Sequence, residues 1–223
     1  MTTREKQNPE ESWPPAQAFL PGARAGLPGL WKAAQDCRAC DLFERATQAV
    51  LGEGPVAAKM MLIGEQPGDQ EDLQGKPFVG PAGRMLDKAL VEAKIDRAGV
   101  YVTNAVKHFK WTTGDRGKRR LHSKPSAREV KACFPWLQRE IGLIEPRVIV
   151  TLGGTAGQAL FGGKFRINAV RGQVIRDSQW APSVVATIHP SAILRDPDPL
   201  NRKRRYEAFV HDLAMAGRAL NAG

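Results

Sequence analysis

The stretch that decides the fold is Met60-Met61-Leu62-Ile63-Gly64-Glu65-Gln66-Pro67-Gly68, followed by a second Gly- and Pro-rich segment over residues 75–84. Residues 60–63 have the length and composition of a buried strand, which breaks into Gly, Glu and Gln. Core packing explains poorly why a carboxylate should follow a strand directly. Because ligands in open α/β sheets bind at the carboxyl ends of strands, the loop from Glu65 is a candidate site.

Strand-like and helical segments alternate along the rest of the chain. We expect strands over residues 59–63, 100–105, 148–152 and 183–188, and helices over residues 30–35 and 82–94. A capping box, Ser126-Ala127-Arg128-Glu129, opens a further helix. Another helix starts at Gly153-Gly154-Thr155, for which a tight turn is favoured over a phosphate site, and a basic helix from about residue 201 closes the chain. This order predicts a three-layer α/β/α fold with a central, mostly parallel four-stranded sheet.

Length and composition indicate one domain. The 223 residues are 42% hydrophobic, enough for a sizeable core. Residues 1–27 are rich in Pro, Gly and charge and are expected to form a loosely ordered tail before a folded domain over residues 28–223. No apolar run is long enough to cross a bilayer, and the polar start lacks the core of a secretory signal. We therefore expect a cytoplasmic protein with no membrane partner. We also expect it to be a monomer.

The charge balance favours a polyanionic partner. Lys and Arg number 33 against 23 Asp and Glu, a formal net charge of +10. Nucleic acid is the first candidate for such a basic protein. A basic surface that serves only solubility is about as common, so charge alone does not decide the partner.

Three cysteines suggest a metal or cluster site. Cys37 and Cys40 form a Cys-Arg-Ala-Cys pair, and Cys133 lies far along the chain. An odd count fits disulfides badly, whereas a two-residue spacer lets two thiolates face one zinc ion or iron–sulfur cluster. His108 is the best candidate for a fourth ligand, because imidazole can replace thiolate on cluster iron. The alternative is a redox or incidental pair, with Cys133 in the core.

Polar side chains follow each predicted strand, and they share one edge of a parallel sheet. Asn104 offers a donor and an acceptor in one planar amide, which suits a nucleobase edge. Phe78 could stack on such a base. Alternatively, Asn104 only forms a turn and Phe78 is a core aromatic. The groups at this edge are Glu65, Gln66, Asn104, Gly153, Gly154 and His189.

A basic loop over residues 114–125 holds Lys118, Arg119 and Arg120. Such a run suits phosphate groups, although it is as often a solvated loop. The presence of His122 in the same loop favours a functional role over a merely solvated loop. A neutral imidazole laid over the strand-end site is a competent nucleophile and general base.

Four motifs occur in order: Gly-Glu-Gln-Pro-Gly-Asp over residues 64–69, Pro-Phe-Val-Gly over 77–80, Asn-Ala-Val-Lys-His over 104–108 and His-Pro-Ser over 189–191. With them the chain resembles the uracil-DNA glycosylase superfamily over roughly residues 30–218. Gln66, His108 in place of the usual cysteine, and the Lys-Arg-Arg-Leu-His loop over 118–122 resemble the UdgX subgroup, relatives of the iron–sulfur family 4 enzymes.

The resemblance implies that uracil is flipped out of DNA, with single-stranded DNA preferred, and is stacked on Phe78. His189 would stabilise the departing base by donating a hydrogen bond. The uracil-binding residues it implies are Gln66, Asp69, Phe78, Asn104 and His189, and the DNA-binding residues are Lys118, Arg119, Arg120 and Ser191. A structural [4Fe-4S] cluster would be held by Cys37, Cys40, His108 and Cys133.

The UdgX-like loop implies an unusual end to the reaction. In hydrolytic relatives water captures C1′ of the sugar, whereas His122 here would attack C1′ and leave the protein joined to DNA. Glu65 would orient or deprotonate His122, or stabilise the cationic sugar. Two alternatives are a turnover enzyme in which His122 only positions water, and a non-catalytic module that binds uracil-containing DNA.

Overall fold

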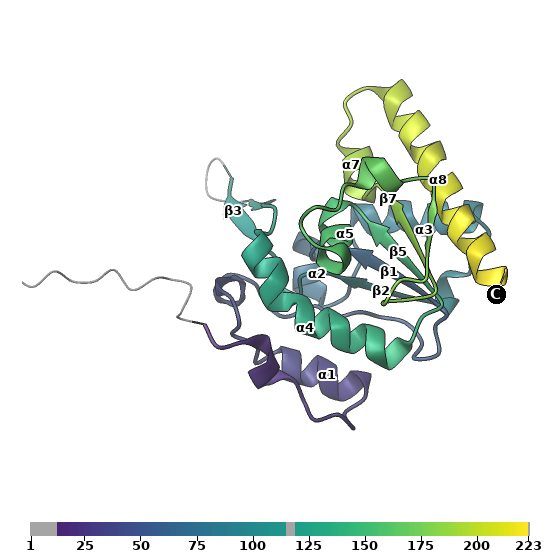
Figure 1. Cartoon of the computed structure of the whole chain (residues 1–223). Coiled ribbons are helices and arrows are strands. Elements are labelled where there is room, and N and C mark those ends of the chain that lie inside the picture. Colours follow the sequence, from purple (N-terminus) through teal and green to yellow (C-terminus); the bar gives the residue numbers. More distant parts are fainter. Residues whose placement is uncertain (1–12, 115–118, 223) are drawn as a thin grey trace, which may run out of the picture.

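The computed structural model describes residues 13–114 and 119–222. Its central sheet (Figure 1) contains β1 Met60–Gly64, β2 Val100–Asn104, β5 Val148–Leu152, β6 Val174–Arg176 and β7 Ser183–Thr187. The strand order is β2-β1-β5-β7-β6, in which the first four are parallel and β6 is antiparallel to β7. Every residue of the four parallel strands is buried, because helices cover both faces.

The predicted α/β class and mostly parallel sheet are confirmed, and all four predicted strands are present. The sheet has five strands rather than four, because β6 adds an antiparallel edge. This strand has three residues, none of them fully buried. So short and exposed a segment carries no periodicity that marks it as a strand.

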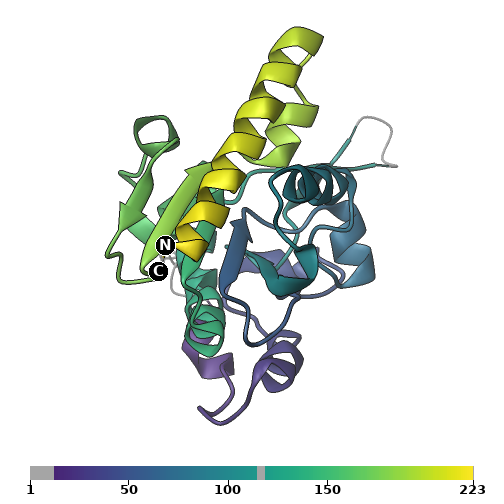
Figure 2. The same ribbon diagram turned by 90° about the vertical axis from the view of Figure 1, so that its right-hand side faces the viewer.

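Helices on both faces of the sheet complete the three predicted layers. One face carries α3 Pro81–Glu92, α7 Pro190–Leu194 and α8 Pro199–Asn221, and the other carries α4 Ala127–Ile144 and α5 Gly154–Phe161. Figure 2 shows α8 lying along the sheet, where it contacts β7 and β5. No helix in the described ranges has the length and apolar composition to span a membrane.

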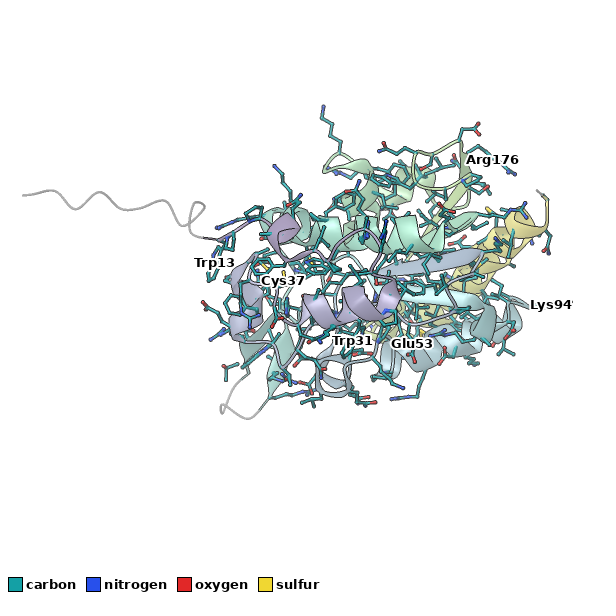
Figure 3. The ribbon with its side chains drawn as sticks, turned by 90° about the horizontal axis from the view of Figure 1, so that it is seen from below. Trp13, Trp31, Cys37, Glu53, Lys94 and Arg176 are labelled. Atoms are coloured by element: carbon teal, nitrogen blue, oxygen red, sulfur yellow. The ribbon has the colours of Figure 1, made fainter. Side chains whose placement is uncertain are left out.

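Three 3₁₀ helices are present, η2 Ala16–Phe19, η3 Asp41–Glu44 and η4 Arg97–Gly99. The remaining α-helices are α1 Leu27–Ala34, α2 Asp69–Gln74 and α6 Ile167–Val170. A separate hairpin consists of β3 Trp111–Thr113 and β4 Arg120–His122. α1 and η2 pack on α4 rather than on the sheet. In Figure 3, Trp31 marks α1 and Cys37 lies just beyond its end. These elements form a third apolar cluster outside the α4 layer.

Part of the expected N-terminal tail is packed. Ala16 is 2% exposed and belongs to the same cluster as Leu30 and Trp136. The Arg139 guanidinium donates to the carbonyls of Gly22 and Ala23 at 3.2 and 2.7 Å. Residues 16–23 are thus held against the domain. Residues 1–12 lie outside the described ranges, and the boundary at residue 27 stays a prediction.

Local side chains set the helix starts. The Ser126 hydroxyl accepts from the Glu129 N–H at 3.2 Å, and the Glu129 carboxylate accepts from the Ser126 N–H at 2.7 Å, so the predicted capping box is present. The terminal helix begins at Pro199, slightly earlier than expected. Asp198 caps it by accepting from the Leu200 N–H at 3.0 Å, and proline suits the first helical position.

Candidate active site

A cavity of about 450 Å³ opens where the parallel strands end. The loop after β1, the end of β2, the β3–β4 hairpin and the start of α7 all contribute to its wall. The structure therefore brings together most of the predicted site: Gln66, Asp69, Phe78, Asn104, Arg119, Arg120, His122, His189 and Ser191 all line this cavity. Lys118 lies outside the described residues.

Two glycines shape the part of the cavity expected to hold a base. A Cβ on Gly64, the last residue of β1, would overlap Oδ1 of Asn104 and lie 2.7 Å from Cζ of Phe78. Phe78 itself has a φ of 57°, an unusual backbone conformation for a bulky residue. A Cβ on Gly83 would overlap the Phe78 carbonyl group. Glycine at position 64 thus lets the Phe78 ring and the Asn104 amide approach the end of β1, and glycine at position 83 lets α3 pack against the Phe78 backbone.

Glu71 fixes the two loops that frame this part of the cavity. Its carboxylate accepts from the N–H of Gly68 at 3.1 Å and from the N–H of Gly80 at 2.7 Å. Gly68 precedes α2 and Gly80 precedes α3, so one buried side chain ties the loop after Glu65 to the loop that holds Phe78.

Glu65 lies between His122 and Thr155. Its Oε1 is 3.5 Å from Nε2 of His122, and its Oε2 accepts a short hydrogen bond from the hydroxyl of Thr155 at the start of α5. The His122 side chain is 37% exposed and that of Glu65 is 23% exposed. The carboxylate is therefore oriented from one side by Thr155 and faces the imidazole on the other.

Arg195 adds a positive charge next to both histidines of the cavity. Burial lowers the pKa of His122 below its usual value, the Glu65 carboxylate opposes this shift, and Arg195 reinforces it. Burial lowers the pKa of His189 to about 4, and Arg195 contributes in the same direction. Both imidazoles are consequently neutral at physiological pH, the form required of a nucleophile or a neutral donor.

The tautomer of His189 follows from its hydrogen bond with Ser191. The backbone N–H of Ser191 donates to Nδ1 of His189 at 3.2 Å, so this nitrogen is an acceptor and the ring proton lies on Nε2. The Ser191 hydroxyl is 2.8 Å from the same nitrogen. Ser191 thus orients the imidazole, in addition to the DNA contact expected of it.

The Gln66 side chain holds the base of the hairpin that carries His122. Its amide nitrogen donates to the carbonyls of Lys110 and Ser123 at 3.2 and 3.1 Å, and its amide oxygen accepts from the Lys110 N–H at 3.0 Å. Lys110 and Ser123 flank β3 and β4. The side chain expected to contact uracil is thus engaged by backbone groups, and its place indicates that it positions His122.

Arg120 is also engaged within the protein. Its guanidinium pairs with Asp69 at 2.6 Å and with the fully buried Asp72 at 2.6 Å, and it lies over the rings of Phe109 and Trp111. These contacts dock the hairpin on α2. Arg120 and Asp69 thus contact each other within the protein, and their expected roles in binding DNA and uracil stay predictions. Arg119 is exposed at the cavity rim.

The four predicted cluster ligands are buried on the α1 side of the molecule. The indole N–H of Trp136 donates to Sγ of Cys37 at 3.2 Å, and the backbone N–H of Lys107 donates to Sγ of Cys133 at 3.2 Å. Burial raises the pKa of Cys40 to about 11 and raises that of Cys133 further, so either thiolate needs a cation nearby. Within the described residues no three His, Cys, Asp or Glu side chains are gathered as ligands of a single metal ion.

A family model described as the uracil DNA glycosylase superfamily matches residues 51–214 of this chain. The chain belongs to the uracil DNA glycosylase superfamily. Three relatives are similar to this chain over most of its length. The type-4 uracil-DNA glycosylase of Archaeoglobus fulgidus is 38% identical over 167 residues, which are 72% of this chain and 79% of the relative. That of Pyrobaculum aerophilum is 34% identical over 195 residues, or 85% and 92% of the two chains. The type-5 uracil-DNA glycosylase of Thermus thermophilus is 33% identical over 186 residues, or 75% and 80%.

This member of the superfamily carries a buried ion pair beneath the Asn104 backbone. Nζ of Lys107 donates to Glu140 at 2.5 Å, to the Thr103 hydroxyl at 2.8 Å and to the Asn104 carbonyl at 2.6 Å. Both charged side chains are at most 1% exposed. The Tyr101 hydroxyl donates to Glu140 at 2.9 Å, and burial next to that carboxylate raises the pKa of the tyrosine. The pair therefore fixes the backbone that presents the Asn104 amide.

Three residues of this superfamily member's site were not among the predicted ones. Glu71 lies three residues after Gly68, at capping-box spacing, which is a detectable signal. Arg195 caps the carboxyl end of α7, four residues after Ser191, so this spacing brings both to the same side of the short helix. Thr155 was assigned only to a tight turn, and no local pattern links it with Glu65.

Proposed function

We propose that this chain excises uracil from DNA and then remains bound to the DNA through a covalent bond between His122 and C1′ of the sugar. The observation that carries the proposal is the 3.5 Å separation of the His122 imidazole and the Glu65 carboxylate beside the cavity. A neutral imidazole next to a carboxylate that can accept its proton is the arrangement required of a nitrogen nucleophile.

Uracil would enter the cavity after flipping out of the strand. Phe78 offers a ring for stacking, Asn104 offers an amide for the base edge, and His189 offers the proton on Nε2. In this assignment Gln66 and Arg120 position the hairpin rather than contact the base or the phosphates. Arg119 at the rim is the residue best placed to meet a phosphate.

In the proposed step the bond between C1′ and N1 of uracil breaks, and its electron pair leaves with the base. A hydrogen bond from His189 stabilises the resulting uracil anion, which then takes a proton from solvent. The lone pair of an imidazole nitrogen of His122 forms the new bond to C1′. The proton released from the ring passes to Glu65, so the substituted imidazole and the Glu65 carboxyl group both end uncharged.

We also propose that Cys37, Cys40, His108 and Cys133 hold a [4Fe-4S] cluster. Each ligand of such a cluster binds a different iron, so the ligands are spread more widely than around a single ion. All four side chains are buried, and the three cysteines belong to one apolar cluster. The N–H donors on Cys37 and Cys133 suit bound thiolates. When bound, the cluster ties three distant segments together and takes no part in excision, which is not a redox step.

The cluster is tested by its iron content and colour. We expect iron and sulfide in the purified protein and broad visible absorption, both lost in Cys40→Ser. A colourless protein that contains zinc would refute this assignment.

The reaction is tested by mass. Purified protein is mixed with a single-stranded oligonucleotide containing one uracil, denatured and weighed. We expect a species equal to protein plus DNA minus uracil, with the modified peptide containing His122. Free uracil and an abasic strand without the adduct would indicate a hydrolytic glycosylase, and binding without release of uracil would indicate a non-catalytic module.

A further inference from the structure

A second cavity, of about 610 Å³, lies between the first half of α4 and α5. Its wall is largely apolar and includes Val130, Phe134 and Ala159. The Phe134 ring is half-buried and packs edge-to-face on Trp180, with ring centroids 5.3 Å apart. A cavity of this volume with an aromatic wall accommodates a planar heterocycle.

The rim of this second cavity is basic. Lys124 and Lys131 border it, and both are exposed. None of the described residues that line the cavity is acidic. Among the described residues, neither lysine has a partner carboxylate. An apolar wall with cations at its rim complements a nucleotide, whose base is apolar on both faces and whose phosphate is an anion.

The second cavity adjoins the candidate active site through Thr155. This residue lines the second cavity, and its hydroxyl donates to Glu65. Lys124 directly follows Ser123, whose carbonyl accepts from Gln66. A strand that places one nucleotide beside His122 can therefore place a neighbouring nucleotide between α4 and α5.

We propose that the cavity between α4 and α5 binds a nucleotide that neighbours the uridine in the same single strand. The base stacks against Phe134, and the phosphate groups bind Lys124 and Lys131. The inference rests on the proposed function, since it extends the DNA path from the active site. This second site binds the DNA strand independently of the identity of the neighbouring base, because base stacking is sequence-tolerant.

The test measures binding of single-stranded oligonucleotides that carry a 2′-fluorinated deoxyuridine, which resists excision. In a series, each flanking nucleotide in turn is replaced by an abasic tetrahydrofuran residue. We expect one flanking position at which loss of the base weakens binding by roughly tenfold. Ala159→Leu, which fills the cavity, should bind the unmodified strand about as weakly and should no longer respond to the abasic residue.

Lys131→Glu changes an exposed side chain and leaves the core packing unaltered. This variant should lower the affinity for the oligonucleotide and reduce the salt dependence of binding, whereas Lys32→Glu on α1 should change neither. Photocrosslinking of a strand with 4-thiothymidine at the sensitive position should label a peptide from α4 or α5. If no abasic position matters, or if Lys131→Glu and Lys32→Glu behave alike, the inference is wrong. Release of uracil from a normal strand is measured separately, so its absence would count against the proposed function alone.

Discussion

Nε2 of His122 lies 3.5 Å from Oε1 of Glu65, although Glu65 follows a strand of the central sheet and His122 ends a strand of a separate hairpin. The Gln66 amide and the Arg120 guanidinium hold this hairpin in place. Thr155 orients the carboxylate from the opposite side. The pair is thus held by contacts among the loop after β1, the hairpin, α2 and α5, and each contact can be removed separately.

The first prediction concerns the nucleophile. His122→Ser should abolish the covalent adduct but still release uracil, because the smaller side chain admits water to C1′. Gel electrophoresis under denaturing conditions and quantitation of free base measure the two products. His211→Ser, on the exposed side of α8, is the matched control. A denaturant-resistant complex formed by His122→Ser would falsify the assignment.

The second prediction concerns Thr155. Thr155→Val removes the hydroxyl that orients Glu65, and we expect adduct formation to slow by roughly 10- to 100-fold, as for loss of a hydrogen bond to a charged group. Thr155→Ser should restore most of the rate. Single-turnover kinetics and thermal melting of the same proteins separate an effect on the reaction from an effect on stability. Equal rates for valine and threonine would show that this hydrogen bond plays no part.

The third prediction concerns pH. Arg195 lowers the pKa of both His122 and His189, so Arg195→Gln should raise both. Because the reaction requires neutral imidazoles, the acid limb of the rate profile should move to higher pH. Adduct formation should fall several-fold at about pH 5 and change little at about pH 8. Arg204→Gln, at an exposed position of α8, should leave the profile unchanged, and an unshifted profile for Arg195→Gln would contradict the prediction.

The fourth prediction distinguishes the two arginines. Arg120→Gln leaves the buried Asp72 without its cation, so the free energy of unfolding should fall by about 2 kcal/mol and adduct formation should slow. The salt dependence of DNA binding should stay the same. Arg119→Gln should instead preserve stability and lower the slope of log affinity against log salt by about 1. Urea denaturation and salt titrations measure both effects, and a reduced slope for Arg120→Gln would identify it as a phosphate contact.

The fifth prediction concerns the buried pair beneath Asn104. Lys107→Met leaves the Glu140 carboxylate buried without its cation, and we expect a loss of about 3–5 kcal/mol. The double variant Lys107→Met with Glu140→Leu should lose less, because no unpaired charge remains. Comparison of the three unfolding curves measures the difference. A double variant less stable than Lys107→Met would argue against this account.

Much of the fold follows from local sequence. The apolar runs at residues 60–63 and 148–152 are buried on both faces, so they mark parallel strands without knowledge of their neighbours. The Ser126 capping box identifies the start of α4 because its hydrogen bonds join residues three apart. The short edge strand β6 is not predicted, since its three residues, two half-buried and one exposed, carry no pattern.

The sequence alone determined which chemistry is available, because the Glu, Asn and His groups follow the strands and meet at one edge of a parallel sheet. Only the tertiary structure decided what these groups contact within the protein. Gln66 and Arg120 carry polar groups that could bind a base or a phosphate, yet both hold the hairpin that presents His122. The sequence marks Thr155 only as part of a turn, whereas in the structure its hydroxyl donates a hydrogen bond to Glu65. Hydrogen bonds between segments far apart in the chain depend on their packing in space, and a local pattern does not encode them.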